Sequence, residues 1–337
     1  MRVPEKLDWA VDGMDWPNRE ASRFVEAAGF RWHVQVMGSG PVILLVHGTG
    51  ASSHSFGELA EILSRTFTVV VPDLPGHGFT DLPPPSRLSM PNMAGDLAAL
   101  LTVLDLQPRV VVGHSAGAAI LIEMCAEELI APVAVVSING ALLPFGSVAG
   151  QFFSPIAKLL VLNPFVPKLF AWRASNEGAV ERLIGGTGSQ LDAERLGYYE
   201  RLFRSETHVE AALGMMASWD LHAFQRRLDS LKVHVILVVG GDDRAISPED
   251  AFKVRDRLPN AEVVYLRGLG HLAHEERPEE IAEIVSTAAR TAVDQVSRFV
   301  NCGLAKSSDT TNVKKCCQLQ LFNVRRHGSA NRAGTRL

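Results

Sequence analysis

One stretch of the chain decides the fold: Val110-Val111-Val112-Gly113-His114-Ser115-Ala116-Gly117. A β-branched run ends in the pattern Gly-x-Ser-x-Gly, and an Ala- and Leu-rich helical pattern begins directly after it. This context is typical of a nucleophile elbow, a tight strand-to-helix turn that holds a serine in a strained conformation above a sheet. Gly113 and Gly117 suit the turn because a Cβ would clash where the two elements nearly touch. The pentapeptide alone fits a plain turn with a solvated serine equally well, so the rest of the chain has to decide.

The composition is that of a globular, enzyme-sized protein. With 337 residues, 47% of them hydrophobic, the chain can bury one large core or two smaller ones, which excludes fibrous and wholly disordered classes. Seven of its 33 basic residues but one of its 37 acidic residues lie in 301–337. The rest of the chain is therefore acidic, which argues against nucleic acid as the main partner.

The cysteines and the N-terminal sequence bear on the compartment. Three of the four cysteines follow residue 300, and their spacing offers neither a disulfide framework nor a zinc site. Acidic residues lie where a secretory signal would have its apolar core, and no stretch approaches the ~18 uninterrupted apolar residues of a membrane span. We therefore expect a cytoplasmic protein without a membrane span.

Short β-rich runs alternate with longer helical patterns, which favours an α/β fold with a mostly parallel central sheet and helices on both faces. The inner strands are apolar throughout, as strands covered on both faces should be. Strands are predicted over 30–37, 42–46, 68–71, 109–113, 133–138, 233–239 and 261–266. Helices are predicted over 91–104, 115–128, 248–257 and 278–295.

About ninety residues separate the strand that ends near Asn139 from the one that opens at Val233. This segment is too long for a simple crossover, and its helical periodicity predicts a helical cap over about 142–225, inserted before the last two strands. After residue 297 the periodicity fades into polar, low-complexity sequence. We expect an N-terminal extension over 1–22, one domain over 23–296 and a basic, disordered tail over 297–337.

The cap holds one strongly apolar segment, Pro144 to Trp172, whose only charged residues are Lys158 and Lys168. Two interpretations stay open. The segment packs onto the core, or it forms an apolar gate for a bulky hydrophobic ligand or a surface that touches a membrane or a partner.

A serine nucleophile needs a base, and the base needs an orienting acid. The strand over 233–239 ends in a loop with Asp242 and Asp243, at the sheet edge where ligands of open α/β sheets bind. We choose Asp243 as the acid because it lies deeper in the loop, whereas Asp242 suits a solvated or capping role. After the next strand, His271 follows a glycine and can reach the serine, so it is the expected base. His274 is expected to be a surface or supporting residue.

The oxyanion of an acyl-transfer intermediate needs donors as well. The expected donors are the backbone amides of Ala116, directly after Ser115, and of Thr49 in the loop after an early strand. His47 and Gly48 belong to the supporting turn of that loop. No glycine pattern for a nucleotide, no phosphate loop and no metal-ligand spacing is present, so no cofactor and no metal is expected.

With these residues in place, the region from 23 to about 290 resembles the α/β-hydrolase superfamily, in which Ser, Asp and His follow one another in this order. Serine at the elbow places the chain in the serine-hydrolase branch, since dehalogenases and epoxide hydrolases of the superfamily have Asp there. The motifs that carry the resemblance are Val46-His47-Gly48-Thr49-Gly50, Asp73-Leu74-Pro75-Gly76-His77-Gly78, Gly113-His114-Ser115-Ala116-Gly117, Gly241-Asp242-Asp243 and Gly270-His271.

A narrower resemblance is to the magnesium-chelatase accessory proteins of bacteriochlorophyll synthesis, in a phototrophic bacterium. It lies in Asp15 to Val25, Arg31 to Gln35, His47 to Ser55 and Asp73 to Thr80. The resemblance implies a pathway rather than a reaction: a hydrolase that assists magnesium insertion into a porphyrin.

Two functions follow as expectations. The first is a serine hydrolase that acts on an ester or another acyl bond of a hydrophobic small molecule. The second is a non-catalytic accessory or porphyrin-binding protein that assists magnesium chelatase. The expected partners are a hydrophobic substrate such as a tetrapyrrole and the magnesium chelatase subunits, with peripheral membrane contact through the cap.

Overall fold

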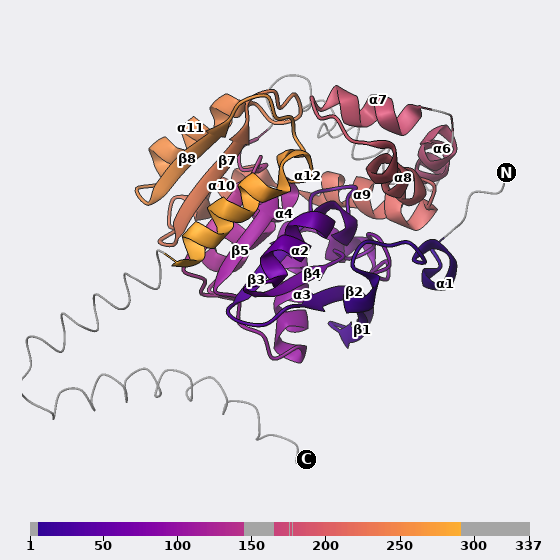
Figure 1. Cartoon of the computed structure of the whole chain (residues 1–337), viewed down its shortest axis with the longest axis horizontal. Helices are drawn as coiled ribbons and strands as arrows, with labels where there is room; N and C mark the ends of the chain where they lie inside the picture. The colour runs from indigo at the N-terminus through magenta and orange to yellow at the C-terminus, as the bar shows by residue number, and fades with distance from the viewer. Residues whose placement is uncertain (1–5, 145–164, 175, 177, 291–337) are drawn as a thin grey trace, which may run out of the picture. The chain divides into compact units, whose positions relative to one another are not determined.

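The computed structural model describes residues 6–144, 165–174, 176 and 178–290 (Figure 1). Contacts divide the chain into two units, Met1–Ala289 and Arg290–Leu337, and the sheet and its helices belong to the first. The predicted tail over 297–337 lies outside the described residues, and so does most of the apolar segment from Pro144 to Trp172.

Eight strands form one sheet: β1 (Ser22–Ala27), β2 (Phe30–Met37), β3 (Val42–Val46), β4 (Thr68–Pro72), β5 (Val110–His114), β6 (Ala134–Ile138), β7 (His234–Gly240) and β8 (Ala261–Leu266). Their order in the sheet is β1-β2-β4-β3-β5-β6-β7-β8. β2 is antiparallel to its two neighbours, β1 and β4. The strands that follow in the sheet, β4, β3, β5, β6, β7 and β8, are parallel to one another. The seven predicted strands are confirmed to within one residue at each end, and the α/β architecture with them.

The edge strand β1 is not among the predicted strands. Its Arg23 and Glu26 interrupt the apolar pattern, and the strand is half-buried because it has a neighbour on one side only. A two-residue turn at Ala28 and Gly29 joins it to β2, and both turn residues have positive φ (56° and 87°), as a tight hairpin requires.

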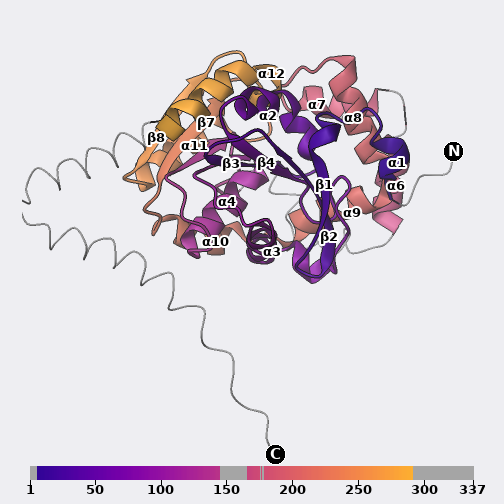
Figure 2. The same cartoon turned by 60° about the horizontal axis from the view of Figure 1, so that its bottom comes forward.

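The helices are α1 (Trp9–Asp12), α2 (Gly57–Ser64), α3 (Met90–Val103), α4 (Ala116–Ala126), α6 (Phe165–Ala174), α7 (Ala179–Gly186), α8 (Ala193–Phe203), α9 (Glu206–Ser218), α10 (Leu221–Leu228), α11 (Pro248–Arg257) and α12 (Ala273–Glu276). Residues 278–290 are helical as well. Alternate residues of the inner strands face two apolar cores: Leu44 and Val46 pack with α3, α4, α10 and α11, while Ile43 and Leu45 pack with α2 and helix 278–290. Helices therefore cover both faces of the sheet, as Figure 2 shows for α2 and α3.

The insertion between β6 and β7 is helical, as predicted. Its helices fall into two groups, one that packs on the sheet and one that forms the cap. Leu221, Phe224 and Leu228 of α10 belong to the main core, so α10 is a crossover helix on the sheet. The cap consists of α6 to α9 in the part of the chain that the structure describes (Figure 1).

The N-terminal residues from 6 onward lie against the core and the cap. Trp16 is 2% exposed, and its ring meets those of Phe79 and Tyr198 edge to face. Arg201 of α8 makes a bidentate ion pair with Asp15 (2.6 and 2.9 Å). In the described residues, no helix is both long enough and apolar enough to cross a membrane.

Candidate active site

Ser115 lies in a strained turn between β5 and α4. Its φ of 50° and ψ of −114° place a residue with a Cβ in a region that favours glycine. A Cβ on Gly113 would overlap the Ala118 amide, and one on Gly117 would overlap the Val46 carbonyl oxygen. The two glycines therefore let strand and helix approach, and the turn leaves Ser115 partly exposed at the carboxyl edge of the sheet.

Asp243 and His271 are joined by a hydrogen bond from Nδ1 to Oδ2 of 2.8 Å. Asp243 is 7% exposed and His271 is 9% exposed, so the pair is shielded from water. Because a carboxylate accepts, Nδ1 carries the proton, and Nε2 keeps the lone pair of a base. The neighbouring Asp242 is exposed. The loop after β7 thus brings Asp243 to the histidine.

The His271 loop is held next to the elbow. His114 Nε2 donates to the His271 carbonyl (3.0 Å), which ties the residue before Ser115 to the loop. The amide of Leu272 donates to Ser189 Oγ in the loop between α7 and α8 (2.8 Å). Among the described residues no hydrogen bond joins Ser115 Oγ to the His271 ring. The two residues are linked through His114.

The loop after β3 lies directly against the elbow. A Cβ on Gly48 would lie 3.0 Å from the Cβ of Ser115. His47 Nε2 accepts from the Leu74 amide (2.9 Å), so its Nδ1 carries the proton and donates to the Gly48 carbonyl (2.8 Å). In a trans peptide the C=O and the following N–H point in opposite directions, so this bond turns the Thr49 amide away from His47.

The amides of Thr49 and Ala116 are both available as donors. Neither amide donates a hydrogen bond to another described residue. Ala116 is 4% exposed and is the first residue of α4, where a backbone N–H has no intrahelical acceptor. Such amides readily bind an anion.

Cap helices α8 and α9 cover this loop. His208 Nε2 donates to the Gly50 carbonyl (3.1 Å), and its Nδ1 accepts from the Gly78 amide (3.1 Å). Thr49 Oγ1 lies 3.5 Å from the sulfur of Met215 on α9, within hydrogen-bond distance. The position of the loop that carries Thr49 therefore depends on the cap.

His274 is not a surface residue, and that part of the expectation is wrong. It is 1% exposed, and its ring centroid lies 4.4 Å from that of His114 and 4.7 Å from that of Phe56. Burial and the neighbouring His271 lower its pKa to about 3. His274 belongs to the short helix α12, in which Ala273, His274 and Glu275 are all buried, and the sequence pattern does not reveal that this helix is buried.

The sequence motifs do not mark two polar residues of the site, Asn139 and His208. Asn139 donates to Asp243 Oδ2 at 2.5 Å, and its only signal in the sequence is its place directly after a strand. His208 lies within a cap helix, and no local pattern marks it. In the described part of the chain, no group of three or more His, Cys, Asp or Glu is arranged to hold a metal ion.

Comparisons with known proteins agree with this architecture. The model of the alpha/beta hydrolase family matches residues 43–284. The magnesium-chelatase 30 kDa subunit of Rhodobacter capsulatus is 37% identical over 264 residues, which is 77% of this chain and 92% of that protein. The hydrolase YugF of Bacillus subtilis is 25% identical over 72% of this chain and 88% of its own length.

Solved structures show the same fold at low sequence identity. A thermophilic esterase from Thermogutta terrifontis superimposes with a TM-score of 0.62 at 21% identity, covering 80% of this chain and 98% of the esterase. A loop variant of a haloalkane dehalogenase from Bradyrhizobium elkanii gives a TM-score of 0.66 at 20% identity, covering 82% and 99%. One fold therefore carries different reactions, and the site has to distinguish them.

Proposed function

The chain belongs to the α/β-hydrolase family, and from this premise we propose that it is a serine hydrolase that cleaves an ester or another acyl bond of a hydrophobic small molecule. The observation that carries the proposal is the buried hydrogen bond between Asp243 and His271 (2.8 Å), whose loop is tied to the strained turn of Ser115. A solvated serine in a plain turn needs neither Asp243 nor His271 close to it.

In this mechanism Ser115 Oγ attacks the acyl carbon while His271 Nε2 takes its proton. Asp243 stabilises the resulting imidazolium and keeps the ring oriented. The negative oxygen of the tetrahedral intermediate accepts hydrogen bonds from the amides of Thr49 and Ala116. The intermediate collapses as the imidazolium protonates the leaving group. Water then attacks the acyl-enzyme while His271 takes its proton, and the bond to Ser115 Oγ breaks as the imidazolium returns that proton to the serine.

The apolar cap and the relative from Rhodobacter capsulatus support a more specific role. We propose an accessory function in magnesium-porphyrin and bacteriochlorophyll synthesis, with a tetrapyrrole as the hydrophobic substrate and the magnesium chelatase subunits as partners. We also propose a cytoplasmic protein with peripheral membrane contact. Leu169 and Trp172 on α6, both more than half exposed, support such a contact through the cap.

A fluorophosphonate probe tests the reaction, because it phosphonylates serines that a neighbouring base activates. We expect the wild-type protein to be labelled and Ser115→Ala to show no labelling, at equal thermal stability. Ser137→Ala is the matched control, since Ser137 is a buried serine on the adjacent strand β6. A folded Ser115→Ala protein that is labelled as strongly as the wild type would overturn the proposal.

The name of the Rhodobacter relative favours a second candidate, a non-catalytic accessory or porphyrin-binding protein of magnesium chelatase. Complementation of a phototrophic strain that lacks this gene separates the two. If catalysis is required, a stably expressed Ser115→Ala protein does not restore pigment synthesis. Full restoration by that variant would favour the binding role.

A further inference from the structure

Asn139 touches the acid of the site, yet the proposed mechanism gives it no role. It directly follows β6, between the strands that lead to Ser115 and to Asp243. Its N–H donates to the Val238 carbonyl (2.8 Å), and the carbonyl of the preceding Ile138 accepts from the Ser115 amide (2.9 Å). Its φ of 46° lies in the left-handed region, which asparagine tolerates better than most residues. The backbone of Asn139 is thus fixed from both sides.

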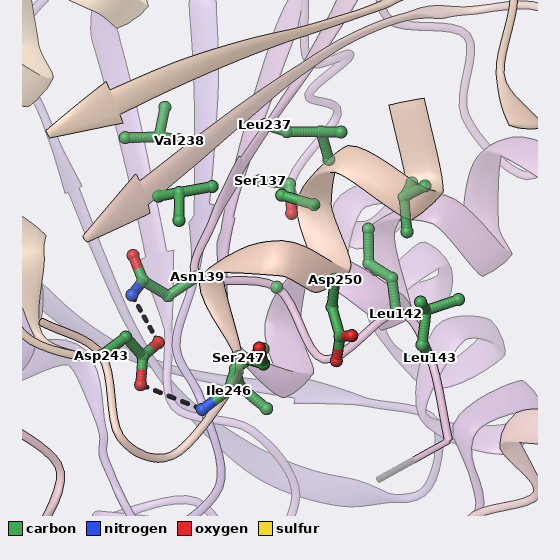
Figure 3. Close-up of a pocket in the computed structure, with 14 residues that line it drawn as sticks. Ser137, Asn139, Leu142, Leu143, Leu237, Val238, Asp243, Ile246, Ser247 and Asp250 are labelled. Carbon is green, nitrogen blue, oxygen red and sulfur yellow. Dashed lines mark hydrogen bonds between the residues drawn. The ribbon is translucent and has the colours of Figure 1, made fainter. Parts of the chain in front are cut away.

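The side-chain amide makes three hydrogen bonds around the acid. Nδ2 donates to Asp243 Oδ2 at 2.5 Å, as Figure 3 shows, and to the Gly270 carbonyl at 3.3 Å. Oδ1 accepts from the Gly240 amide at 3.2 Å. Because the two oxygens accept and the backbone N–H donates, only this orientation of the amide satisfies all three contacts. Asn139 is 3% exposed, so its polar atoms depend on these bonds.

Four donors surround the Asp243 carboxylate. Oδ1 accepts from the amides of Ala245 (2.7 Å) and Ile246 (2.9 Å), and Oδ2 accepts from His271 and Asn139. A carboxylate offers about four acceptor positions, so each is occupied. Asn139 shares the oxygen to which His271 is bonded, whereas the other two donors hold the far oxygen.

We propose that Asn139 is a positioning residue of the catalytic site. It fixes the direction in which Oδ2 faces His271, and through Gly270 it also holds the residue before the base. This inference rests on the proposed serine-hydrolase function. Without the amide, the carboxylate rotates and the imidazole follows it, and a displacement of about 1 Å costs on the order of a hundredfold in rate.

Ser137 provides a matched control. It lies two residues earlier on β6 and lines the same cavity of about 20 Å³ as Asn139 and Asp243 (Figure 3). Its buried Oγ has no hydrogen-bond partner among the described residues. Ser137→Ala therefore perturbs the same strand and cavity without removing a bond to the acid.

Two variants separate positioning from support of the fold. Asn139→Gly deletes the amide without straining the backbone, because glycine readily adopts positive φ. Asn139→Asp keeps the size and shape of the side chain. While neutral, the introduced carboxyl donates to Asp243 as the amide does, but once ionised it repels the acid. Relative to the wild type at the same pH, the second variant is therefore most active while the new carboxyl is neutral, and it loses activity as the pH rises through the raised pKa of that carboxyl.

The first readout is the rate of fluorophosphonate labelling across a pH series. We expect Asn139→Gly to react roughly ten- to a hundredfold more slowly than the wild type, by the cost of misplacement. Asn139→Asp adds a fall in rate with rising pH, and Ser137→Ala follows the wild-type curve. The second readout needs no reactivity: the proton NMR resonance of His271 Nδ1–H, which reports its bond to Asp243, shifts in Asn139→Gly and stays in place in Ser137→Ala.

The outcomes separate this inference from the proposed function. If both Asn139 variants fold and react with the wild-type rate and pH dependence, Asn139 is no positioning residue and the hydrolase proposal stands. If the wild type is not labelled at all, the function fails, and the NMR resonance alone decides: a resonance unchanged in both variants overturns the positioning role. If Asn139→Gly does not fold, Asn139→Asp gives the same decision.

Discussion

Gly117 lies where a helix and a strand approach too closely for any side chain. A Cβ there would overlap the carbonyl oxygen of Val46, which belongs to β3 and cannot move without shifting the sheet. We expect Gly117→Ala to lower the free energy of unfolding by roughly 1–3 kcal/mol, the usual cost of overpacking. The same shift displaces Ser115, so labelling by a fluorophosphonate slows as well. Denaturant unfolding and labelling rates measure the two effects.

Gly95 is the control for this substitution. It lies on the exposed face of α3, and a Cβ there meets no atom within 4 Å. Gly95→Ala should raise the free energy of unfolding by about 0.5–1 kcal/mol, because alanine loses less backbone entropy in a helix. A Gly117→Ala protein that gained stability in the same way would contradict the close approach at the elbow.

Single residues differ in how far the sequence reveals them. Ser115, Asp243 and His271 each follow a strand of their own, with a glycine one or two positions away, so strand topology alone brings them to one edge. Asn139 also follows a strand, but an isolated asparagine after a strand has many uses, and its bond to Asp243 depends on the path of a loop about a hundred residues later. His274 is buried because α12 packs its ring beside Phe56 and His114, which are distant in the sequence.

At the scale of elements, α9 is joined by His208 to the loop that carries Thr49. Burial lowers the pKa of this histidine to about 4, so the neutral ring that bonds both Gly50 and Gly78 persists at neutral pH. His208→Ala leaves two buried backbone groups unpaired, each at a cost of about 1–3 kcal/mol. It also loosens the loop that carries Thr49. We expect a lower free energy of unfolding and slower fluorophosphonate labelling.

Glu210→Ala serves as the control on the same helix, because Glu210 is exposed and such surface substitutions change stability by about 0.5 kcal/mol or less. If His208→Ala were labelled at the wild-type rate, the loop that carries Thr49 would keep its position without the bonds of His208.

Sequence periodicity predicts some helices and strands more accurately than others. Strands buried on both faces are apolar without interruption, so their limits are readable to within a residue. β1 has one neighbour and a half-buried pattern, which makes it hard to distinguish from a loop. The periodicity of the insertion correctly predicts helices. It does not show that α10 packs on the sheet while α6 to α9 form the cap, because periodicity reveals an apolar helix face but not what that face packs against.

At the scale of the whole molecule, the core contains an unusual set of neutral histidines. Burial, the largest cause in each case, lowers the pKa of six of them: His47, His54, His77, His114, His208 and His274. Each is neutral when folded but titrates near its ordinary value of 6.5 when the chain unfolds. Their stability contribution is therefore complete above pH 6.5 and is lost as the pH falls from 6.5 toward the folded pKa.

Glu275 acts in the opposite direction. Burial raises its pKa to about 8, so its contribution is complete below its ordinary value of 4.5 and is lost as the pH rises toward 8. Burial raises the pKa of Asp96 as well, but two carboxyls do not offset six histidines, so unfolding below pH 6.5 takes up protons on balance. Each proton corresponds to about 1.4 kcal/mol per pH unit, against a total stability of about 5–15 kcal/mol. We expect mild acid to unfold the protein.

His274 allows this account to be tested one proton at a time. Neither of its ring nitrogens has a hydrogen-bond partner among the described residues, and it lies between Phe56 and His114. His274→Leu therefore removes a titrating group without breaking a hydrogen bond, although His274 Nε2 lies 3.9 Å from Glu275 Oε1. Denaturant unfolding between about pH 6 and pH 5, where the protein is still folded, should show a slope of stability against pH that is smaller by about 1.4 kcal/mol per unit. The control is His234→Gln, at a histidine whose side chain is 46% exposed, and equal slopes in the two variants would contradict the role of burial.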